Sequence, residues 1–213
     1  MELLRMHAYT RLLLQVDFVP YAEEGIILYN GQTSTGEGDF VSLTLKDGFV
    51  EFRFNLGSGT TILKSVDKVA MGKQVKLIAK RYLQDATLSV EGQDDVAGRS
   101  EGELNSLDLA ENLFIGNVPS KQKKIFDNVG IKQGFVGCMQ KLRVGQREVV
   151  LRFPSSKDVL KIYELHDCSD NPCTNSPCKN SAACRPERGL MGPYTCQCQK
   201  GFIGKDCGIG VSR

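Results

Sequence analysis

Apolar and polar residues alternate with a period of two over several short stretches in the first three quarters of the chain. In residues 11–18, every second position is apolar, at Leu12, Leu14, Val16 and Phe18. Such alternation turns one side of a strand toward a core and the other toward solvent. Residues 41–45 and 50–54 alternate in the same way and flank Asp47-Gly48, a pair that favours a hairpin turn because Gly readily takes a positive φ. These stretches predict antiparallel strands.

Further short strands are predicted along the chain, with Gly, Pro, Asn or Asp in the gaps: residues 26–29, 75–80, 87–90, 113–115, 135–144 and 149–153. No stretch has the sustained 3.6-residue periodicity of a helix, although residues 159–165 allow either one helical turn or another strand. Residues 98–102 and 120–124 are expected to be solvated loops. Many short strands at this spacing predict an all-β antiparallel sandwich or barrel, whose sheets need burial on only one face.

Composition and charge exclude several functions. The 213 residues carry 27 basic and 25 acidic side chains, too even a balance for a dedicated nucleic-acid binder. The longest apolar runs fall far short of the roughly 20 residues that span a bilayer. Neither His7 nor His166 has an evident Ser or Cys partner, and Gly57-Ser58-Gly59 lacks the spacing of a nucleophile elbow or phosphate loop. We therefore expect a protein that is not an enzyme.

The cysteines are concentrated at the C-terminal end. Residues 1–167 contain only Cys138, and residues 168–213 hold the other seven. So short a segment cannot bury enough apolar surface to fold alone and needs disulfides or a metal. Such cysteine density is typical of an oxidising compartment. Residues 1–7 do not form a secretory leader, since Arg5 and His7 interrupt the apolar stretch, so we expect a piece of a longer extracellular protein.

The last six cysteines have the spacing Cys173-x4-Cys178-x5-Cys184-x11-Cys196-x-Cys198-x8-Cys207, and Gly201-Phe202-Ile203-Gly204 lies in the final interval. Six cysteines alone allow 15 connectivities. A zinc site is the alternative, but the only close pair, Cys196-Gln197-Cys198, has the wrong gap for a zinc knuckle. The even count leaves Cys138 and Cys168 as natural partners. A free-thiol count distinguishes disulfides from zinc.

This segment resembles the epidermal growth factor (EGF)-like module. The resemblance implies the disulfides Cys173–Cys184, Cys178–Cys196 and Cys198–Cys207. Calcium-binding modules of this kind place acidic or amide residues before the first cysteine and between the third and fourth. Here Pro172 stands directly before Cys173, and residues 185–188 lack the usual Asp or Asn. The module is therefore expected to be a spacer that binds no calcium.

A series of glycine-containing motifs precedes this module. In order they are Gly25–Gly31, Gly38-Asp39-Phe40, Gly57-Ser58-Gly59, Leu113-Phe114-Ile115-Gly116 and Gly134-Phe135-Val136-Gly137-Cys138. The series resembles laminin G-like domains of basement-membrane proteoglycans. This family implies a jelly-roll sandwich and a Cys138–Cys168 disulfide. The expected organisation is a laminin G-like domain over residues 1–168, an EGF-like module over 169–208 and a tail at 209–213.

Many laminin G-like domains hold one calcium ion at the rim of the sandwich. By position, the resemblance implies as ligands the carboxylates of Asp39 and Asp108 and the carbonyls of Leu56 and Ser106. These four oxygens suit a hard cation that takes 6–8 oxygen ligands, and two carboxylates predict weak affinity. Glu37 and Glu111 are nearby acids that could contribute instead. In the alternative interpretation, Asp39 caps a loop and Asp108 faces solvent.

The expected function is that of a non-catalytic, extracellular matrix or basement-membrane binding module that recognises cell-surface glycoproteins or glycans with the help of calcium. The resemblance suggests dystroglycan-type glycans, integrins or other matrix proteins as partners. One alternative is a purely structural spacer. Another is binding of heparin or heparan sulfate through a basic loop at Lys121, Lys123 and Lys124, since clustered positive charge attracts sulfated glycans.

Overall fold

The computed structural model describes residues 2–3, 6, 8–118, 122–149, 159–161, 166–168, 173, 177–186 and 194–211. The chain divides into two units, Met1–Leu165 and His166–Arg213. In the described part of the chain, no helix has the length and apolar character needed to cross a membrane.

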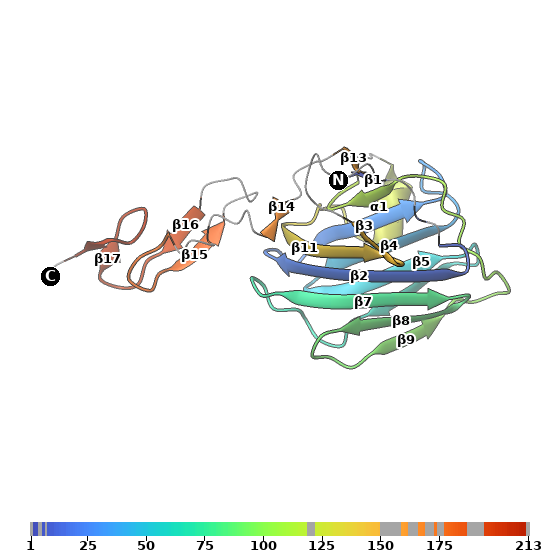
Figure 1. Cartoon of the computed structure of the whole chain (residues 1–213), viewed down its shortest axis with the longest axis horizontal. Coiled ribbons are helices and arrows are strands. Elements are labelled where there is room, and N and C mark those ends of the chain that lie inside the picture. The colour runs from blue at the N-terminus through green and yellow to red at the C-terminus, as the bar shows by residue number, and fades with distance from the viewer. Residues whose placement is uncertain are drawn as a thin grey trace. The chain divides into compact units, whose positions relative to one another are not determined.

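The first unit is a sandwich of two antiparallel sheets, and Figure 1 shows β11, β2, β7, β8 and β9 in the layer in front of β3, β4 and β5. One sheet, here called the covered sheet, has the order β13-β1-β10-β3-β4-β5-β6. Its strands are β1 (Glu2–Leu3), β3 (Gly25–Gly31), β4 (Phe40–Lys46), β5 (Phe49–Asn55), β6 (Thr60–Lys64), β10 (Leu113–Ile115) and β13 (Val159–Lys161).

The second sheet, here called the bare sheet, has the order β12-β11-β2-β7-β8-β9. Its strands are β2 (Arg11–Pro20), β7 (Val75–Tyr82), β8 (Asp85–Val90), β9 (Val96–Arg99), β11 (Gly137–Val144) and β12 (Arg147–Val149). The prediction of an all-β antiparallel sandwich is confirmed.

The core lies between the two sheets and follows the alternation of the sequence. The inward residues of β2, namely Leu12, Leu14, Val16 and Phe18, are all buried. They pack in one cluster with Leu43 and Phe52 of the covered sheet. Burying side chains of this size contributes about 1.5–3 kcal/mol each, so the two inner faces supply the main driving force for folding.

The hairpin predicted at Asp47-Gly48 is confirmed. Phe40–Lys46 and Phe49–Asn55 pair in antiparallel register, with Lys46 opposite Phe49. Both turn residues have positive φ, 53° at Asp47 and 81° at Gly48. Two positive φ values define the turn that matches the twist of a hairpin, and Asp and Gly tolerate them best.

The prediction that burial on one face would suffice is wrong for the covered sheet. All seven residues of β3 are buried. The outer face of this sheet is covered by the helix α1 (Lys123–Val129), which buries Ile125 and Val129 against Tyr29 and Phe40. The solvated loop predicted at residues 120–124 is therefore wrong at Lys123 and Lys124, which belong to α1. A helix of seven residues contains too few apolar positions for its periodicity to stand out.

Strand ends differ from the predictions in smaller ways. The strand β6 was not predicted because it lies at a sheet edge and is polar at most positions. The expected loop at residues 98–102 begins within β9, whose Arg99 pairs with Asp85. Residues 159–161, for which the sequence allowed either a helical turn or a strand, form the strand β13. Residues 150–153 and 162–165 lie outside the described part of the chain.

Beneath α1 lies an ion pair that is buried on the covered sheet. Arg53 Nη2 and Nε donate to Glu51 Oε2 at 2.6 and 2.9 Å, and each side chain is only 8% exposed. Arg53 Nη1 also donates to the carbonyl of Asn128 in α1 at 3.4 Å. The helix ends at Gly130, whose φ of 77° suits the left-handed conformation that ends many helices. A Cβ at Gly130 would overlap the guanidinium of Arg53.

The second unit is built on short strands joined by disulfides. Its strands are β14 (His166–Asp167), β15 (Ala183–Pro186), β16 (Tyr194–Gln197), β17 (Phe202–Ile203) and β18 (Ile209–Gly210). The disulfides are Cys173–Cys184, Cys178–Cys196 and Cys198–Cys207, the three pairs that the EGF-like resemblance implied. Cys138 and Cys168 are disulfide-bonded as well, and no described cysteine is free.

We expect Gly130→Ala to destabilise the sandwich more than Gly72→Ala does. Both glycines have similar positive φ, 77° and 72°, so both variants incur the roughly 1–2 kcal/mol of the left-handed conformation. Only at Gly130 does the new methyl group displace a buried ion pair, so the free energy of unfolding should fall by about 3 kcal/mol or more in Gly130→Ala. Urea unfolding of the two variants measures the difference, and equal losses would show that Arg53 moves aside at no cost.

Candidate metal site at one end of the sandwich

Asp39 lies in the loop that leads into β4 and is fixed there by Gln32. The backbone N–H of Asp39 donates to Gln32 Oε1 at 3.0 Å, and the N–H of Gln32 donates to the carbonyl of Asp39 at 2.8 Å. Gly38 precedes Asp39 with a φ of 84°. Asp39 is 9% exposed, which is unusual for a carboxylate without a direct ion pair. The loop thus holds an acidic side chain in a defined and nearly buried position.

Asp108 meets Asp39 from a segment 69 residues further along the chain. The backbone N–H of Asp108 donates to Asp39 Oδ2 at 2.9 Å. The side chains of Leu107 and Leu109 are buried in the core on either side of Asp108, which is itself exposed. This alternation anchors the segment and leaves the carboxylate of Asp108 free to turn toward Asp39. The two predicted acidic ligands are therefore brought together.

The other oxygen of Asp39 faces the loop after β5. Oδ1 accepts no hydrogen bond from any described residue, and an ideal Cβ on Gly57 would lie 3.9 Å from it. Leu56, whose carbonyl is a predicted ligand, directly precedes Gly57 and is buried. Ser106, the fourth predicted ligand, is half-buried in the segment that carries Asp108. All four predicted residues thus belong to segments that meet at, or lead directly to, Asp39.

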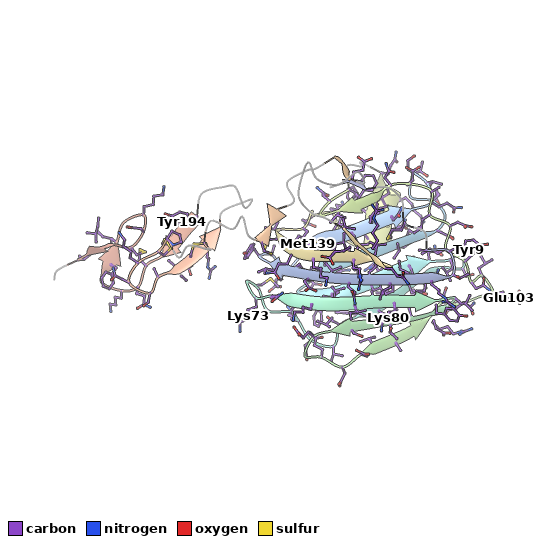
Figure 2. All side chains as sticks on the ribbon, in the orientation of Figure 1. Tyr9, Lys73, Lys80, Glu103, Met139 and Tyr194 are labelled. Atoms are coloured by element: carbon purple, nitrogen blue, oxygen red, sulfur yellow. A yellow bond between two sulfur atoms is a disulfide. The ribbon has the colours of Figure 1, made fainter. Side chains whose placement is uncertain are left out.

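Arg81 is a component of this end of the sandwich that sequence reasoning missed. Its side chain is 2% exposed although it carries a full charge. Its Nη2 donates to the carbonyls of Ala8 and Tyr9 at 2.6 and 2.7 Å, and its Nη1 donates to the carbonyls of Leu83 and Asn105. One guanidinium therefore joins three loops. Tyr9 and Glu103 mark this end of the sandwich in Figure 2.

A signal for Arg81 was present in the sequence. In β7 the inward positions are Val75, Leu77, Ala79 and Arg81, so a charged residue continues an apolar series on the core side of the strand. A buried charge requires compensation. Carbonyl oxygens from three loops supply it here, and these long-range contacts could not be read from the pattern of one strand.

The electrostatics of the site centre on Asp39. Burial is the main cause that raises the pKa of Asp39 above its ordinary value, and the negative charge of Asp108 raises it further. The N–H of Asp108 and the positive charge of Arg81 act in the opposite direction. Burial lowers the pKa of Arg81 to about 10, against the opposing effect of Asp39. The carboxylate pair therefore repels itself and gains from an added cation.

The residues present fit a weakly held calcium ion. Two adjacent carboxylates, one of them with an oxygen that accepts no hydrogen bond from the described residues, match the oxygen preference of Ca²⁺. Nowhere in the described ranges do three or more His, Cys, Asp or Glu side chains gather into a metal cluster. Protein ligands beyond the two carboxylates would thus have to be carbonyls, such as those of Leu56 and Ser106.

Among the described residues, no hydrogen bond or ion pair joins either of the alternative acids, Glu37 and Glu111, to Asp39. Glu37 is exposed, and its described contact is a carbonyl that accepts from Thr33 Oγ1 at 2.8 Å. The charge of Glu111 acts on Tyr29 instead. The charged groups that shift the pKa of Asp39 are Asp108 and Arg81. Glu37 and Glu111 as alternative ligands stay a prediction.

The other predicted functional residues are only partly described. Lys123 and Lys124 are exposed in the first turn of α1, whereas Lys121 lies outside the described residues. The same holds for His7, for the side chain of His166 and for residues 170–172. A basic cluster at Lys121, Lys123 and Lys124 stays a prediction.

The chain belongs to the laminin G domain family: the family model for the laminin G domain matches residues 18–150, and that for the EGF-like domain matches residues 168–206. The resemblance seen in the sequence is thus confirmed. Bovine pikachurin is 32% identical over 193 residues, which cover 91% of this chain. The basement membrane-specific heparan sulfate proteoglycan core protein of mouse is 35% identical over 201 residues, or 92% of this chain.

Solved structures support the fold. Domains LG4-5 of the mouse laminin alpha1 chain superpose with a TM-score of 0.60 at 24% identity, over 69% of this chain and 40% of that one. The present chain spans only 18% of bovine pikachurin and 5% of the mouse proteoglycan core protein. It therefore corresponds to a pair of modules within much longer relatives.

We expect Arg81→Met to destabilise the sandwich by about 3–5 kcal/mol, because it removes the donors that satisfy carbonyls in three loops. Arg99→Met is the matched control. Arg99 is exposed and donates to the carboxylate of Asp85 at 2.7 and 2.8 Å and to Gln84 Oε1 at 2.6 Å, so its loss should cost no more than about 1–2 kcal/mol. Chemical unfolding followed by circular dichroism measures both, and similar losses would remove the special role given to Arg81.

Asp39 should make stability depend on pH in a defined direction. Because its pKa is raised in the folded state, the folded protein holds the proton more tightly than the unfolded chain. Asp39 therefore favours folding below its ordinary pKa, and this contribution is lost as the pH rises through the raised pKa. Asp39→Asn can still accept from the N–H of Asp108 but does not titrate.

The measurement is made with metal removed by EDTA. The free energy of unfolding of Asp39→Asn, minus that of the unmodified protein, should increase from pH 3 to pH 7. Unfolding curves at both pH values measure this change. Asp94→Asn, at an exposed position, is the control and should show no comparable trend. A relative stability of Asp39→Asn that falls with rising pH would contradict the assignment.

Proposed function

We propose that this chain is a non-catalytic binding module of the extracellular matrix, and that it recognises glycans or glycoproteins at the Asp39–Asp108 end of the sandwich with calcium. The observation that carries the proposal is the meeting of two acidic residues from distant segments: the N–H of Asp108 donates to Asp39 Oδ2, the charge of Asp108 raises the pKa of Asp39, and Asp39 Oδ1 has no donor among the described residues. Bound calcium would compensate their repulsion and keep coordination positions for an acidic group of the partner.

An extracellular location is supported by the cysteines and by the relatives. All described cysteines are disulfide-bonded, a state that persists in oxidising compartments. One relative is by name a basement membrane-specific proteoglycan core protein. Together these observations favour the matrix or a basement membrane as the place of action. Dystroglycan-type glycans, integrins and other matrix proteins are the partners that we propose to test.

A binding role rather than catalysis is supported by the chemistry of the same end of the sandwich. It offers carboxylates, carbonyls and one guanidinium whose Nη1 and Nη2 donors are already used by the protein's own backbone. The described cysteines are consumed in disulfides, so none is available as a nucleophile.

Isothermal titration of the full chain with CaCl2 tests the metal site. We expect one site with a Kd of about 10⁻⁴–10⁻³ M, the range of extracellular calcium modules. Asp39→Asn/Asp108→Asn should abolish the heat of binding. Asp94→Asn/Asp95→Asn is the matched control, since it removes two adjacent and exposed carboxylates elsewhere and should leave the affinity unchanged. Equal loss in both variants would point to diffuse cation binding.

Immobilised dystroglycan-type glycoprotein then separates recognition from a purely structural spacer. Retention of the chain in millimolar calcium and elution by EDTA, both lost in Asp39→Asn/Asp108→Asn, would support the proposal. Failure to bind calcium in the titration would instead favour the spacer. Retention that persists in EDTA and in the variant would place recognition on another surface.

A further inference from the structure

The two sheets of the sandwich differ on their outer faces. The middle of the outer face of the covered sheet is buried under α1, which packs on Tyr29 and Phe40. On the bare sheet, by contrast, alternate residues of β2, β7 and β8 are half-buried or exposed on the side away from the core. Figure 1 shows this sheet as the front layer of the sandwich, and Figure 2 shows Lys80 on it.

A groove of about 880 Å³ crosses the bare sheet. It runs over β2, β7, β8 and β9, and the turn at Gly145-Gln146 borders it. Neighbouring strands lie about 4.8 Å apart, so four strands give the groove a length of roughly 15 Å. Its volume is that of a typical small-ligand site.

The floor of the groove is formed by two rows of residues that face each other across the strands. One row is Arg11, Tyr82, Asp85 and Arg99, and the next is Leu13, Lys80, Thr87 and Ala97. The rows combine an aromatic ring, short apolar side chains and a hydroxyl. Tyr82 is 54% exposed, which is high for an aromatic residue in the middle of a sheet.

Two cations of the groove form no ion pair with any described residue. Arg99 is neutralised by Asp85 at 2.7 Å, and on the same sheet Lys76 pairs with Glu91 at 3.1 Å. No described carboxylate forms an ion pair with Arg11 or Lys80. Arg11 faces Tyr82 across β2 and β7, and Lys80 lies two residues before Tyr82 on β7. Arg11 and Lys80 are therefore diagonal neighbours, about 7–8 Å apart.

Arg11 is positioned by Tyr82. Its Cζ lies 5.2 Å from the centroid of the Tyr82 ring, so the guanidinium rests over the aromatic face. Such stacking leaves the N–H groups at the edge of the guanidinium available for the two oxygens of a carboxylate. The ammonium of Lys80 adds a second positive charge. The groove therefore complements an anion that also has apolar surface.

From this combination we infer that the groove binds an oligosaccharide that carries carboxylate groups. The carboxylate contacts Arg11 and Lys80, the sugar rings lie on Leu13, Thr87 and Ala97, and the hydroxyl groups bond to Gln146 and to the Arg99–Asp85 pair. This site shares none of the proposed metal ligands, Asp39, Leu56, Ser106 and Asp108.

An acidic peptide fits the groove less well than a sugar. Extended peptides bind sheets chiefly by adding a strand at an edge, where backbone groups are unpaired. Within the groove the backbones of β2, β7 and β8 are already paired with their neighbours on both sides. The strand β9 at the end of the groove is a sheet edge, but a peptide added there would run along β9 and not across the groove. Across β2, β7 and β8 only side chains are offered, in a shallow surface that crosses the strands, and these suit hydroxyl groups and ring faces.

The test is a titration of the full chain, in EDTA, with three carboxylated probes: 3′-sialyllactose, a hyaluronan tetrasaccharide and trigalacturonic acid. EDTA keeps the proposed metal site out of the measurement. We expect at least one probe to bind and neutral maltotetraose not to bind. Arg11→Gln/Lys80→Gln should weaken the affinity at least tenfold, and rising salt should weaken it in the unmodified protein.

The matched control is Lys76→Gln/Lys141→Gln, which removes two positive charges from the same sheet outside the groove and should leave the affinity unchanged. Asp39→Asn/Asp108→Asn should also bind normally, which separates this site from the proposed function. Chemical shifts of Leu13, Tyr82 and Thr87 should move on binding. Failure of all three probes, equal affinity in Arg11→Gln/Lys80→Gln, or binding of hexaglutamate as tight as that of the sugars would overturn the inference.

Discussion

The burial of one guanidinium determines how this end of the sandwich is built. Arg81 is 2% exposed, and its Nη1 and Nη2 donate to carbonyl oxygens from three loops, whereas its Nε is buried without a partner among the described residues. Removing a charge from water is costly unless it is fully hydrogen-bonded, so these loops cannot move apart without exposing an unpaired cation. One of the loops leads to Asp108, and the positive charge of Arg81 also acts on Asp39. The positions of Asp39 and Asp108 therefore depend on the hydrogen bonds of Arg81, although neither carboxylate accepts one of them.

The two sheets differ in whether their outward residues must be buried, and this difference is a second constraint on the structure. The covered sheet turns Tyr29 and Phe40 outward and must bury them, and the short helix α1 does so while resting on the Glu51–Arg53 pair. The bare sheet has charged, polar and small outward residues that need no cover. A face that does not require burial is free to bind another molecule, and its groove arises where side chains are short, at Thr87 and Ala97.

Much of this architecture could be predicted from the sequence because it depends on local patterns. The period of two in β2 predicts a strand, and Asp47-Gly48 predicts a hairpin turn, each from a few neighbouring residues. The cysteine spacing identifies the EGF-like module. Features that depend on contacts between distant segments could not be predicted from local patterns. The helix α1 is seven residues long, and its role depends on the outward residues of distant strands. The meeting of Asp39 with Asp108 was expected only through the family resemblance, since a separation of 69 residues carries no local signal. Arg81 shows the same limit, because its partners lie in three different loops.

The strand β7 links the two surfaces through three consecutive residues. Arg81 points inward and anchors the end of the sandwich, while its neighbours Lys80 and Tyr82 point outward into the groove. Because side chains alternate along a strand, fixing the direction of one residue fixes that of the next. A shift of β7 by one residue would place Lys80 or Tyr82 in the core and Arg81 in solvent, which would cost the loop contacts and the groove together. The two surfaces can bind separate ligands, yet both depend on the register that the buried guanidinium enforces.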